Sequence, residues 1–562
     1  MTKSNAISGS EASTEPVPLK IVIVGAGIAG LTAAIGLRRQ GHEVHSYEQS
    51  QFADEIGAAI HISPNANSVL RKLGVDVAER GAPKLLRTRY FDLNCKLLSE
   101  VDNDAQGHRW QAVNAEPQRR FMSWLQAHRG HLHSQLKERA TSPKYPGIAA
   151  RLYTSSRIVE VDVHNATLTM ADDSVVEGDV VVGADGVRSV TRRAVAGPGH
   201  DSFEIGKNAF RFMVRKADIL ADPETRDLGE AMGTMDLYFS AEHKVIIYPC
   251  VDNTLLNVVC IHPAHQSNTK RSDETYNKGV SRETLLEIFH EFSPKLLKIF
   301  EKCERDTLKV YPLFDALTMP TFIKDRLALI GDAAHPFTPF IGQGGATAIE
   351  DAVSLGVILS RGTTRAEVPE RLQVYNKARY GRATLIQGHS RLAGGDGVKA
   401  GDEKAARMTG RENALYALSH DEYDASVQVL REHQWSKLTG VMWRQPTVFG
   451  PMSGLSVVAP TRGLVYLLRF LPIPSLQRYF AAEGKIVQFG QNAFNDYISK
   501  YGRDSGRRNL LTKIVTNKTA EEAPMSDREI YVEISSLVFA GTDTTSITLT
   551  YLFWDLARHQ EW

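Results

Sequence analysis

Residues 20–48 read KIVIVGAGIAGLTAAIGLRRQGHEVHSYE. The apolar run IVIV is typical of a short buried strand, and GAGIAG is typical of a turn. LTAAIGLRRQ then favours a helix that Gly41 ends, and EVHSYE favours a second strand. This order of strand, turn, helix and strand predicts one βαβ unit of an α/β fold.

The turn of this unit contains three glycines, Gly25, Gly27 and Gly30, with the spacing Gly-x-Gly-x-x-Gly. Glycine at these positions permits a tight turn, a close approach of the backbone to a pyrophosphate, and close packing of the helix on the strand. The helix N-terminus favours phosphate through its free amides and its dipole. Glu48, at the end of the second strand, can bind ribose hydroxyls. The pattern predicts a dinucleotide site but does not distinguish FAD from NAD.

The composition excludes several classes of partner. The chain has 562 residues with 66 basic and 65 acidic side chains, so no charge excess favours a nucleic-acid partner. Its four cysteines, of which Cys303 is the last, lack the Cys-x-x-Cys spacing. We therefore predict no metal site and no disulfide framework, which fits a cytoplasmic location. Residues 1–18 are polar and are expected to be a disordered leader rather than a secretion signal.

The middle of the chain predicts a second kind of sheet. Residues 203–262 contain FRFMV, KVIIYPC and LLNVVCI, which favour antiparallel strands. RETLLEIFHEFSPKLLKIFEKC, residues 282–303, is expected to be helical, and so is most of 366–435. The predicted fold class is α/β: a Rossmann-like domain, an antiparallel-sheet domain and a mostly helical C-terminal extension.

Two later segments carry a family resemblance. They are DVVVGADGVRSVTRR, residues 179–193, and RLALIGDAAHPFTPFIGQGGATAIEDA, residues 326–352. Together with the glycine motif, they resemble the three signatures of single-component FAD-dependent aromatic hydroxylases. These are the salicylate- and p-hydroxybenzoate-hydroxylase-like enzymes, in their fungal secondary-metabolism branch. The resemblance covers about residues 19–435 and implies an FAD-binding domain of that type.

The resemblance also implies which residues bind FAD. Asp332 would accept a hydrogen bond from a ribityl hydroxyl. Gly342, Gly344 and Gly345 open a helix whose N-terminus would face the flavin and favour the negative charge of its reduced form. Asp185 is expected to serve FAD and NAD(P)H, with a simple turn residue as the alternative.

A further family match lies in EIGAAIHISPNANSVLRKLG, residues 55–74. Gly57 and Ala59 correspond to a Gly-Ala-Gly turn along the cofactor, although Ala59 replaces the commoner glycine. Arg129 corresponds to an arginine on FAD, with a solvated surface arginine as the alternative.

Two residues are candidates for the substrate site. Arg211 stands within the apolar alternation of FRFMV, where an unpaired buried charge is costly. The resemblance implies that it holds a phenolate or carboxylate near the flavin, and the alternative is an arginine on the solvent face. Tyr248 could orient a phenol, with core packing as the alternative.

The activity implied by the resemblance is hydroxylation of a phenolic or polyketide-type small molecule. NAD(P)H reduces FAD, O2 adds to form a flavin hydroperoxide, and an electron-rich ring attacks it. The cofactors expected are FAD and the co-substrate NAD(P)H. The alternatives left open are a flavin-dependent epoxidase or dehydrogenase, and a flavin-binding scaffold without turnover.

The end of the sequence resembles a second family. Residues 535–562, SSLVFAGTDTTSITLTYLFWDLARHQEW, resemble the oxygen-side helix of a haem-thiolate cytochrome monooxygenase. Ala540, Gly541, Asp543 and Thr544 would be the family positions, with a chance match as the alternative. Because no cysteine follows Cys303, we expect no haem and interpret the segment as a truncated relic. Residues 454–476 are apolar enough to allow weak membrane contact.

The predicted domain limits follow from these segments. They are a disordered leader (1–18), a discontinuous FAD-binding domain (19–200 and 305–395), a substrate domain (201–304), a helical closing segment (396–435) and the haem-thiolate-monooxygenase-like fragment (436–562).

Overall fold

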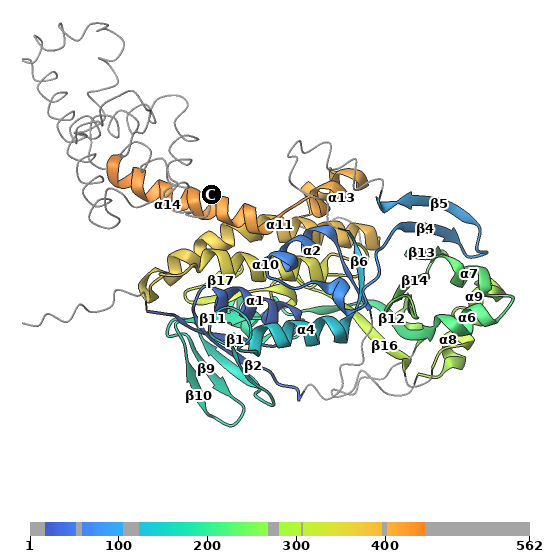
Figure 1. The fold of residues 1–562 in the computed structure, drawn as a ribbon, viewed down its shortest axis with the longest axis horizontal. Helices are drawn as coiled ribbons and strands as arrows, with labels where there is room; N and C mark the ends of the chain where they lie inside the picture. The colour runs from blue at the N-terminus through green and yellow to red at the C-terminus, as the bar shows by residue number, and fades with distance from the viewer. Residues whose placement is uncertain are drawn as a thin grey trace, which may run out of the picture. The chain divides into compact units, whose positions relative to one another are not determined.

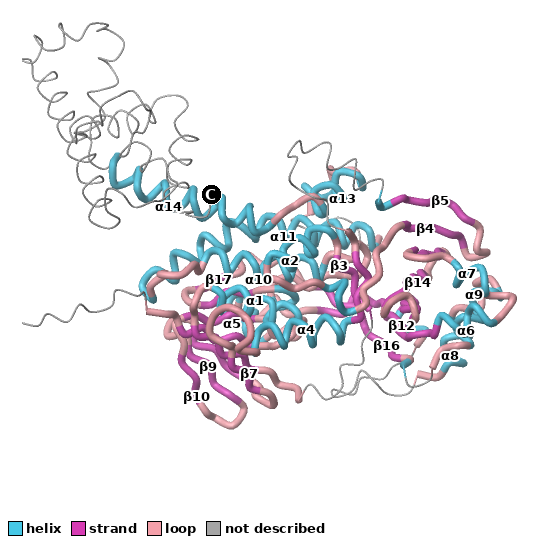
Figure 2. Tube along the Cα trace, viewed as in Figure 1, coloured by secondary structure: helices cyan, strands magenta, loops and turns pink. Residues whose placement is uncertain are grey.

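The computed structural model describes residues 17–51, 59–104, 123–267, 280–304, 307–395, 399 and 402–443. The chain divides into two units, Met1–Arg431 and Glu432–Trp562. Residues 432–443 of the second unit continue a helix. Both secondary-structure types occur in the first unit (Figure 2), as predicted for an α/β fold.

The predicted βαβ unit forms the centre of a six-stranded sheet in the order β17-β18-β11-β1-β2-β7. The strands are Ile323–Lys324 (β17), Leu327–Leu329 (β18), Val180–Gly183 (β11), Lys20–Val24 (β1), Glu43–Tyr47 (β2) and Arg151–Tyr153 (β7). All neighbours are parallel except β17 and β18. The strands β1, β11 and β18 are almost wholly buried, which explains their continuous apolar runs.

Helices pack on this sheet and on one another. They are Ile28–Arg39 (α1), Pro64–Lys72 (α2), Arg129–Thr141 (α4), Val190–Ala196 (α5), Gly344–Ile358 (α10) and Val368–Gly394 (α11). A side chain added at Gly356 would lie 3.1 Å from the Cα of Gly36. Helices α1 and α10 therefore pack closely because each has a glycine where they meet (Figure 1).

Two small sheets complete this part of the fold. One has the strands Ile158–Asp162 (β8), Thr167–Met170 (β9) and Val175–Glu177 (β10), and Leu168 joins the core of the six-stranded sheet. The other pairs Ala59–Ile62 (β3) with Leu125–His128 (β6) in antiparallel register.

The second large sheet has seven strands in the order β16-β12-β15-β14-β13-β4-β5. The strands are Lys309–Asp315 (β16), Phe203–Arg215 (β12), Leu255–Pro263 (β15), Lys244–Cys250 (β14), Thr234–Phe239 (β13), Arg87–Asp92 (β4) and Leu97–Asp102 (β5). It is antiparallel except between β13 and β4. Three of its strands, β4, β5 and β16, lie outside residues 201–304, the limits predicted for the substrate domain. Those limits remain a prediction.

Short helices bury one face of this sheet. They are Lys216–Ala221 (α6), Arg226–Glu230 (α7), Arg282–Ile288 (α8) and Pro294–Glu301 (α9). Phe210 and Phe212 of β12 pack there with Phe289, Phe292 and Phe300. The single helix expected over 282–303 is thus two helices: α8 ends at Ile288, and Pro294 begins α9, where its missing amide has no helical partner to lose.

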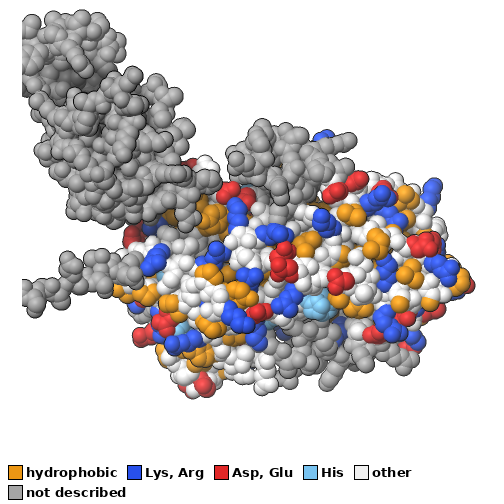
Figure 3. Space-filling model, in the orientation of Figure 1, with side chains coloured by type: hydrophobic (Ala, Val, Ile, Leu, Met, Phe, Trp, Pro, Cys, Tyr) orange, Lys and Arg blue, Asp and Glu red, His pale blue; other side chains and the backbone are white. Residues whose placement is uncertain are grey.

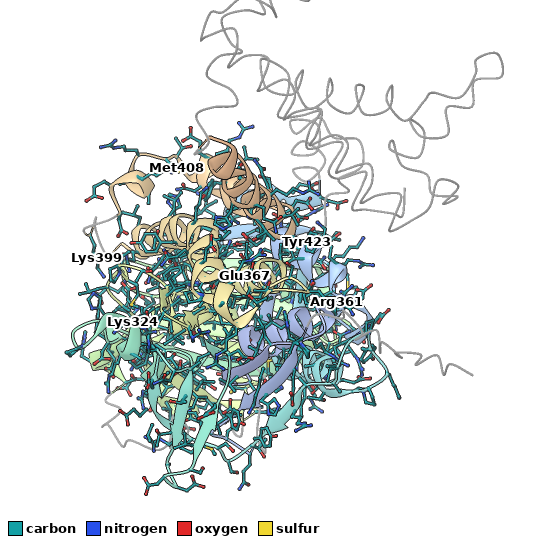
Figure 4. All side chains as sticks on the ribbon, turned by 90° about the vertical axis from the view of Figure 1, so that its left-hand side faces the viewer. Lys324, Arg361, Glu367, Lys399, Met408 and Tyr423 are labelled. Atoms are coloured by element: carbon teal, nitrogen blue, oxygen red, sulfur yellow. The ribbon has the colours of Figure 1, made fainter. Side chains whose placement is uncertain are left out.

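Within the described residues, three further helices follow α11: Glu403–Ala406 (α12), Gly410–Leu418 (α13) and Glu422–Trp443 (α14). Tyr423, labelled in Figure 4, lies in the first turn of α14. The ammonium of Lys72, at the end of α2, lies 4.9 Å from the centroid of its ring. Basic and acidic side chains are interspersed on the face of the described residues seen in Figure 3, in keeping with the net charge of +1. No helix among the described residues is both long and apolar enough to cross a membrane.

Some predicted features lie outside the described residues. They are most of the leader, Gly57, the apolar segment 454–476 and the string AGTDTT at 540–545.

Candidate cofactor and substrate site

A cavity of about 310 Å³ is lined by residues of the seven-stranded sheet, of the β3 strand, and of the turns and helix starts that follow strands of the six-stranded sheet. The predicted site residues that line it are Gly27, Ala59, Arg129, Arg211, Tyr248, Asp332, Gly342, Gly344 and Gly345. Gly25, Gly30, Glu48 and Asp185 do not line it. The fold thus joins residues that are more than 300 positions apart in the sequence.

The three glycines of the first motif have three different roles. Gly25 has a φ of +98°, and a Cβ there would lie 2.4 Å from the Ala184 carbonyl oxygen. A Cβ on Gly30 would lie 2.1 Å from the Gly25 carbonyl oxygen, so Gly30 permits the helix to pack on the turn. A Cβ on Gly27 would meet nothing within 4 Å. Gly27 therefore borders open space in the cavity, as a close approach of a ligand requires.

Glu48 supports this turn from the adjacent strand end. Its Oε2 accepts a hydrogen bond from the Ala26 amide at 2.9 Å, and its Oε1 accepts one from the Ser50 amide at 2.9 Å. Helix α1 begins after Gly27 without a side-chain cap, so its first amides are free to bind an anion.

The Gly331-Asp332 motif forms a turn of 3-10 helix at the other side of the cavity. Gly331 has a φ of +58°, and the Asp332 side chain is exposed to the cavity. Burial within the surrounding protein raises the pKa of Asp332, although His335 and Arg129 oppose that effect. Arg192 holds the turn by donating hydrogen bonds to the carbonyl oxygens of Asp332 and Ala333.

The glycines before α10 contribute differently from one another. Gly342 has a φ of +64°, so the loop needs glycine there for its backbone conformation. A Cβ on Gly345 would lie 2.8 Å from Cδ1 of Ile60, so this glycine lets strand β3 approach the helix. Helix α10 begins at Gly344 without a side-chain cap from Gln343, which leaves its amides free at the cavity wall.

Asp185 has its carboxylate engaged within its own turn. Its oxygens accept hydrogen bonds from the hydroxyls of Ser189 and Thr191, both at 2.6 Å, and from the Val190 amide at 2.7 Å. This geometry supports the alternative of a turn residue that caps α5. Ala184 and Gly186 of this motif line the cavity, and Arg192 connects the motif to the Gly331-Asp332 turn.

Two arginines face the cavity. Arg211 lies on β12 with its guanidinium carbon 5.5 Å from the centroid of the Tyr311 ring. Its buried Nε has no hydrogen-bond partner within the described ranges. Burial lowers the pKa of Arg211, and the charge of Arg129 lowers it further, but a guanidinium stays protonated. Because Arg211 lines the cavity, the alternative of an arginine on the solvent face is disfavoured.

Tyr248 is buried on β14, and its hydroxyl donates a hydrogen bond to the Ala59 carbonyl oxygen at 3.0 Å. Its proton is therefore engaged, and only its oxygen lone pairs are left for a ligand. The bond also fixes strand β3 to β14. The ring of His61 packs on the Tyr248 ring with 4.4 Å between centroids.

His61 lines the cavity and was not a candidate in the sequence analysis. Burial lowers its pKa to about 4, so its imidazole is neutral at physiological pH. The signal that could have found it is its place in GAAIHI, two residues after Ala59 in a strand. Side chains two apart in a strand share a face.

These residues fit an FAD molecule. Gly27 leaves room for a close backbone approach, the N-termini of α1 and α10 both open at the cavity without side-chain caps, and the Asp332 carboxylate faces it. Anionic phosphates and a ribityl hydroxyl are the groups that such donors and acceptors bind.

Comparisons with known proteins agree with this fit. The family model described as "FAD binding domain" matches residues 18–388. The FAD-dependent monooxygenase cfoG of Aspergillus candidus is 34% identical over 69% of this chain and 88% of its own. Hispidin-3-hydroxylase of Neonothopanus nambi is 29% identical over 66% of this chain and 87% of its own. A salicylate hydroxylase in a substrate complex has the same fold, with a TM-score of 0.56 and 22% identity over 74% of this chain and 98% of that one.

A second family model, described as "Cytochrome P450", matches residues 457–562. It confirms the resemblance of the C-terminal segment and contradicts the prediction that no haem takes part. That prediction depended on where the sequence ends, which carries no weight against a family match. The prediction of no haem is therefore wrong, and the segment points to a haem-thiolate monooxygenase.

Proposed function

The chain belongs to the FAD-binding-domain family and is an FAD-dependent monooxygenase. We propose that it uses NAD(P)H and O2 to hydroxylate a phenolic or polyketide-type small molecule. The site residues predicted from the sequence are proposed to act in this reaction, with the exception that Asp185 supports the turn. Secondary metabolism is the proposed setting, because its relatives include fungal monooxygenases and a hydroxylase.

The observation that carries this proposal is the position of Arg211. Its guanidinium faces the cavity, its Nε has no partner among the described residues, and the charge of Arg129 is close enough to lower its pKa. Two neighbouring cations favour an anionic group as ligand. A phenolate or carboxylate on an aromatic ring supplies such a group, and a nearby cation lowers the pKa of a phenol.

The cofactor-binding residues have separate proposed roles. The amides at the start of α1, next to Gly27, would face the pyrophosphate, and Asp332 would accept a hydrogen bond from a ribityl hydroxyl. The N-terminus of α10 would favour negative charge on the reduced flavin. When bound, FAD supplies the redox chemistry by taking electrons from NAD(P)H and activating O2.

The rest of the cavity would position the ring and exclude water. Ile246 and Val259 of the seven-stranded sheet line it together with Ile60 and Phe337. These apolar side chains suit an aromatic ring and leave few places for water, which would otherwise compete in the oxygenation.

The test is a screen of phenolic acids, hydroxylated pyrones and aromatic polyketides with the purified full chain. Each compound is incubated with NADH or NADPH under labelled dioxygen, and both NAD(P)H oxidation and product mass are measured. We expect at least one compound to accelerate NAD(P)H oxidation and to gain one labelled hydroxyl oxygen. A product without label would indicate a dehydrogenase, a labelled epoxide would indicate an epoxidase, and either result would contradict ring hydroxylation.

A further inference from the structure

His61 lies where the cofactor end and the sheet end of the cavity meet. It belongs to β3, and its ring packs on Tyr248 of β14. On another side, a Cβ on Gly342 would lie 3.7 Å from its Cδ2. Its imidazole is therefore held between the seven-stranded sheet, which carries Arg211, and the loop that leads into α10.

The ring nitrogens of His61 are available to a ligand. No hydrogen bond joins either nitrogen to another residue in the part of the chain that the structure describes, and the residue lines the cavity. Burial lowers the pKa of His61 to about 4. The charged groups that line the same cavity, Arg129, Arg211 and Asp332, include two cations that disfavour a third positive charge. A neutral imidazole has one nitrogen that accepts a proton.

The other titratable groups near the cavity are engaged or differently placed. The Tyr248 hydroxyl already donates to Ala59. His335 does not line the cavity, and its Nε2 lies 2.5 Å from Oδ2 of Asp351. Asp332, in the Gly331-Asp332 turn, is proposed to accept a hydrogen bond from the ribityl chain of FAD. Among the described lining residues, His61 is thus the neutral proton acceptor on the side of Arg211 and Tyr248.

We propose that His61 is the catalytic base that accepts the hydroxyl proton of the phenolic substrate during oxygenation. This inference rests on the proposed function and deepens it, because it requires a substrate with a free ring hydroxyl. A methyl ether or a ring without a hydroxyl would bind but would not react.

The proton balance is simple. A ring carbon forms a bond to one oxygen atom of O2 while the O–O bond breaks, and the other oxygen atom leaves as water with the two electrons that NAD(P)H supplies. The phenolic O–H then becomes strongly acidic, its electron pair stays on oxygen to form a C=O bond, and its proton passes to a nitrogen of His61. The oxygenated ring carbon finally loses its hydrogen as a proton and the C=O oxygen regains one, which restores an aromatic ring with two hydroxyls. A weak base suffices because the oxygenated ring is a much stronger acid than the starting phenol. The proton leaves His61 for water after product release.

The test compares His61→Phe, which keeps an aromatic ring against Tyr248 but has no acceptor, with His61→Gln, which keeps an amide oxygen. His164→Gln is the control, since His164 is exposed in a hairpin outside the cavity. The probes are 4-hydroxybenzoate and 4-methylbenzoate, which differ by a hydroxyl against a methyl group of similar size. Their dissociation constants are measured from changes in the flavin absorbance, after FAD content has been checked.

We expect the wild type and the His164→Gln control to bind 4-hydroxybenzoate more tightly than 4-methylbenzoate. In His61→Phe the ratio of the two dissociation constants should fall about tenfold, as expected for the loss of one hydrogen bond. His61→Gln should keep the preference, because its amide oxygen accepts. With the most active phenol of the screen, both variants should divert NAD(P)H oxidation from hydroxylated product to hydrogen peroxide.

Equal preference in wild type and His61→Phe, unchanged coupling in His61→Gln, or a wild-type flavin spectrum that neither probe changes would each overturn the role of His61. A wild type that binds FAD and prefers the hydroxyl probe but oxygenates no phenol would instead contradict the proposed function. The two failures are therefore distinguishable.

Discussion

Arg211 carries a charge that its own strand does not neutralise. Its neighbours on β12, Phe210 and Phe212, are buried in the core beneath the sheet, whereas Arg211 points to the opposite face and into the cavity. Alternation along one strand thus places one charge in an otherwise apolar region. A buried donor without a partner is costly, so a ligand that pairs with Arg211 gains that interaction.

We predict that Arg211→Met retains FAD but loses coupled hydroxylation. Removal of a hydrogen bond to a charged group should weaken binding of an acidic substrate by roughly 10- to 100-fold. Substrate affinity, FAD content and the ratio of product to NAD(P)H consumed are the measurements. Arg215→Met is the matched control, since Arg215 ends the same strand but is exposed and pairs with Asp218. Full coupling in Arg211→Met would remove this residue from the substrate site.

Among the secondary-structure elements, helix α10 connects the Gly331-Asp332 turn to the interior of the protein. Asp351 on this helix accepts a hydrogen bond from the Gly331 amide at 2.9 Å and lies 2.5 Å from Nε2 of His335. Its other oxygen accepts from Nε of Arg379 on α11 at 2.8 Å. Burial alone would raise the pKa of Asp351, but His335 and Arg379 hold it below the ordinary carboxyl value.

The carboxylates next to Asp351 could suggest a metal site. Glu350, His420 and Glu422 lie close enough to share one ion. However, Arg379 donates to both glutamates, and Arg382 donates to Glu350. Two guanidiniums already neutralise these oxygens, so a buried ion-pair cluster explains them better than a cation does.

We predict that Asp351→Asn destabilises the fold by about 3 kcal/mol, because it leaves a buried cation without one of its partners. The Gly331-Asp332 turn should loosen as well, so that FAD binds more weakly. Thermal unfolding and FAD titration measure the two effects. Asp201→Asn, which removes a surface ion pair with Arg193, should change stability by less than about 1 kcal/mol. Equal stability of the two variants would contradict an anchoring role for Asp351.

Some elements could be predicted from sequence because their signals are local. The strand, turn and helix of residues 20–39 follow from apolar periodicity and glycine spacing. The break between α8 and α9 was missed because the apolar pattern continues across it, although Pro294 is typical of a helix start. The addition of β4 and β5 to the seven-stranded sheet could not be predicted, because a parallel pairing such as β4 with β13 joins distant segments.

In the molecule as a whole, the cavity lies where the seven-stranded sheet and the β3 strand meet the turns that follow strands of the six-stranded sheet. Motifs predicted Gly27 and Asp332 as cofactor residues, and the family is confirmed. His61 was missed although it stands two residues after Ala59 in the same strand. The contact that Gly345 permits with Ile60 could not be predicted, because it depends on a neighbour from another element. The haem prediction failed for a different reason: it relied on the end of the sequence rather than on the residues of the segment.

We propose that this cavity holds FAD next to Gly27, and the FAD content of the purified protein is the measurement that tests this proposal. Gly27 has an ordinary backbone conformation and open space around it, so Gly27→Asp should fold. Its carboxylate would repel the pyrophosphate and fill the space that the phosphate needs. Gly381→Asp is the control, since Gly381 is exposed on α11 with nothing within 4 Å.

Flavin absorbance per chain is measured after gel filtration with added FAD, and circular dichroism checks the fold of each protein. We predict that the wild type and Gly381→Asp retain stoichiometric FAD, whereas Gly27→Asp is folded and colourless. A Gly27→Asp protein that retains full FAD, or a folded wild type that binds none, would contradict the binding of FAD next to Gly27.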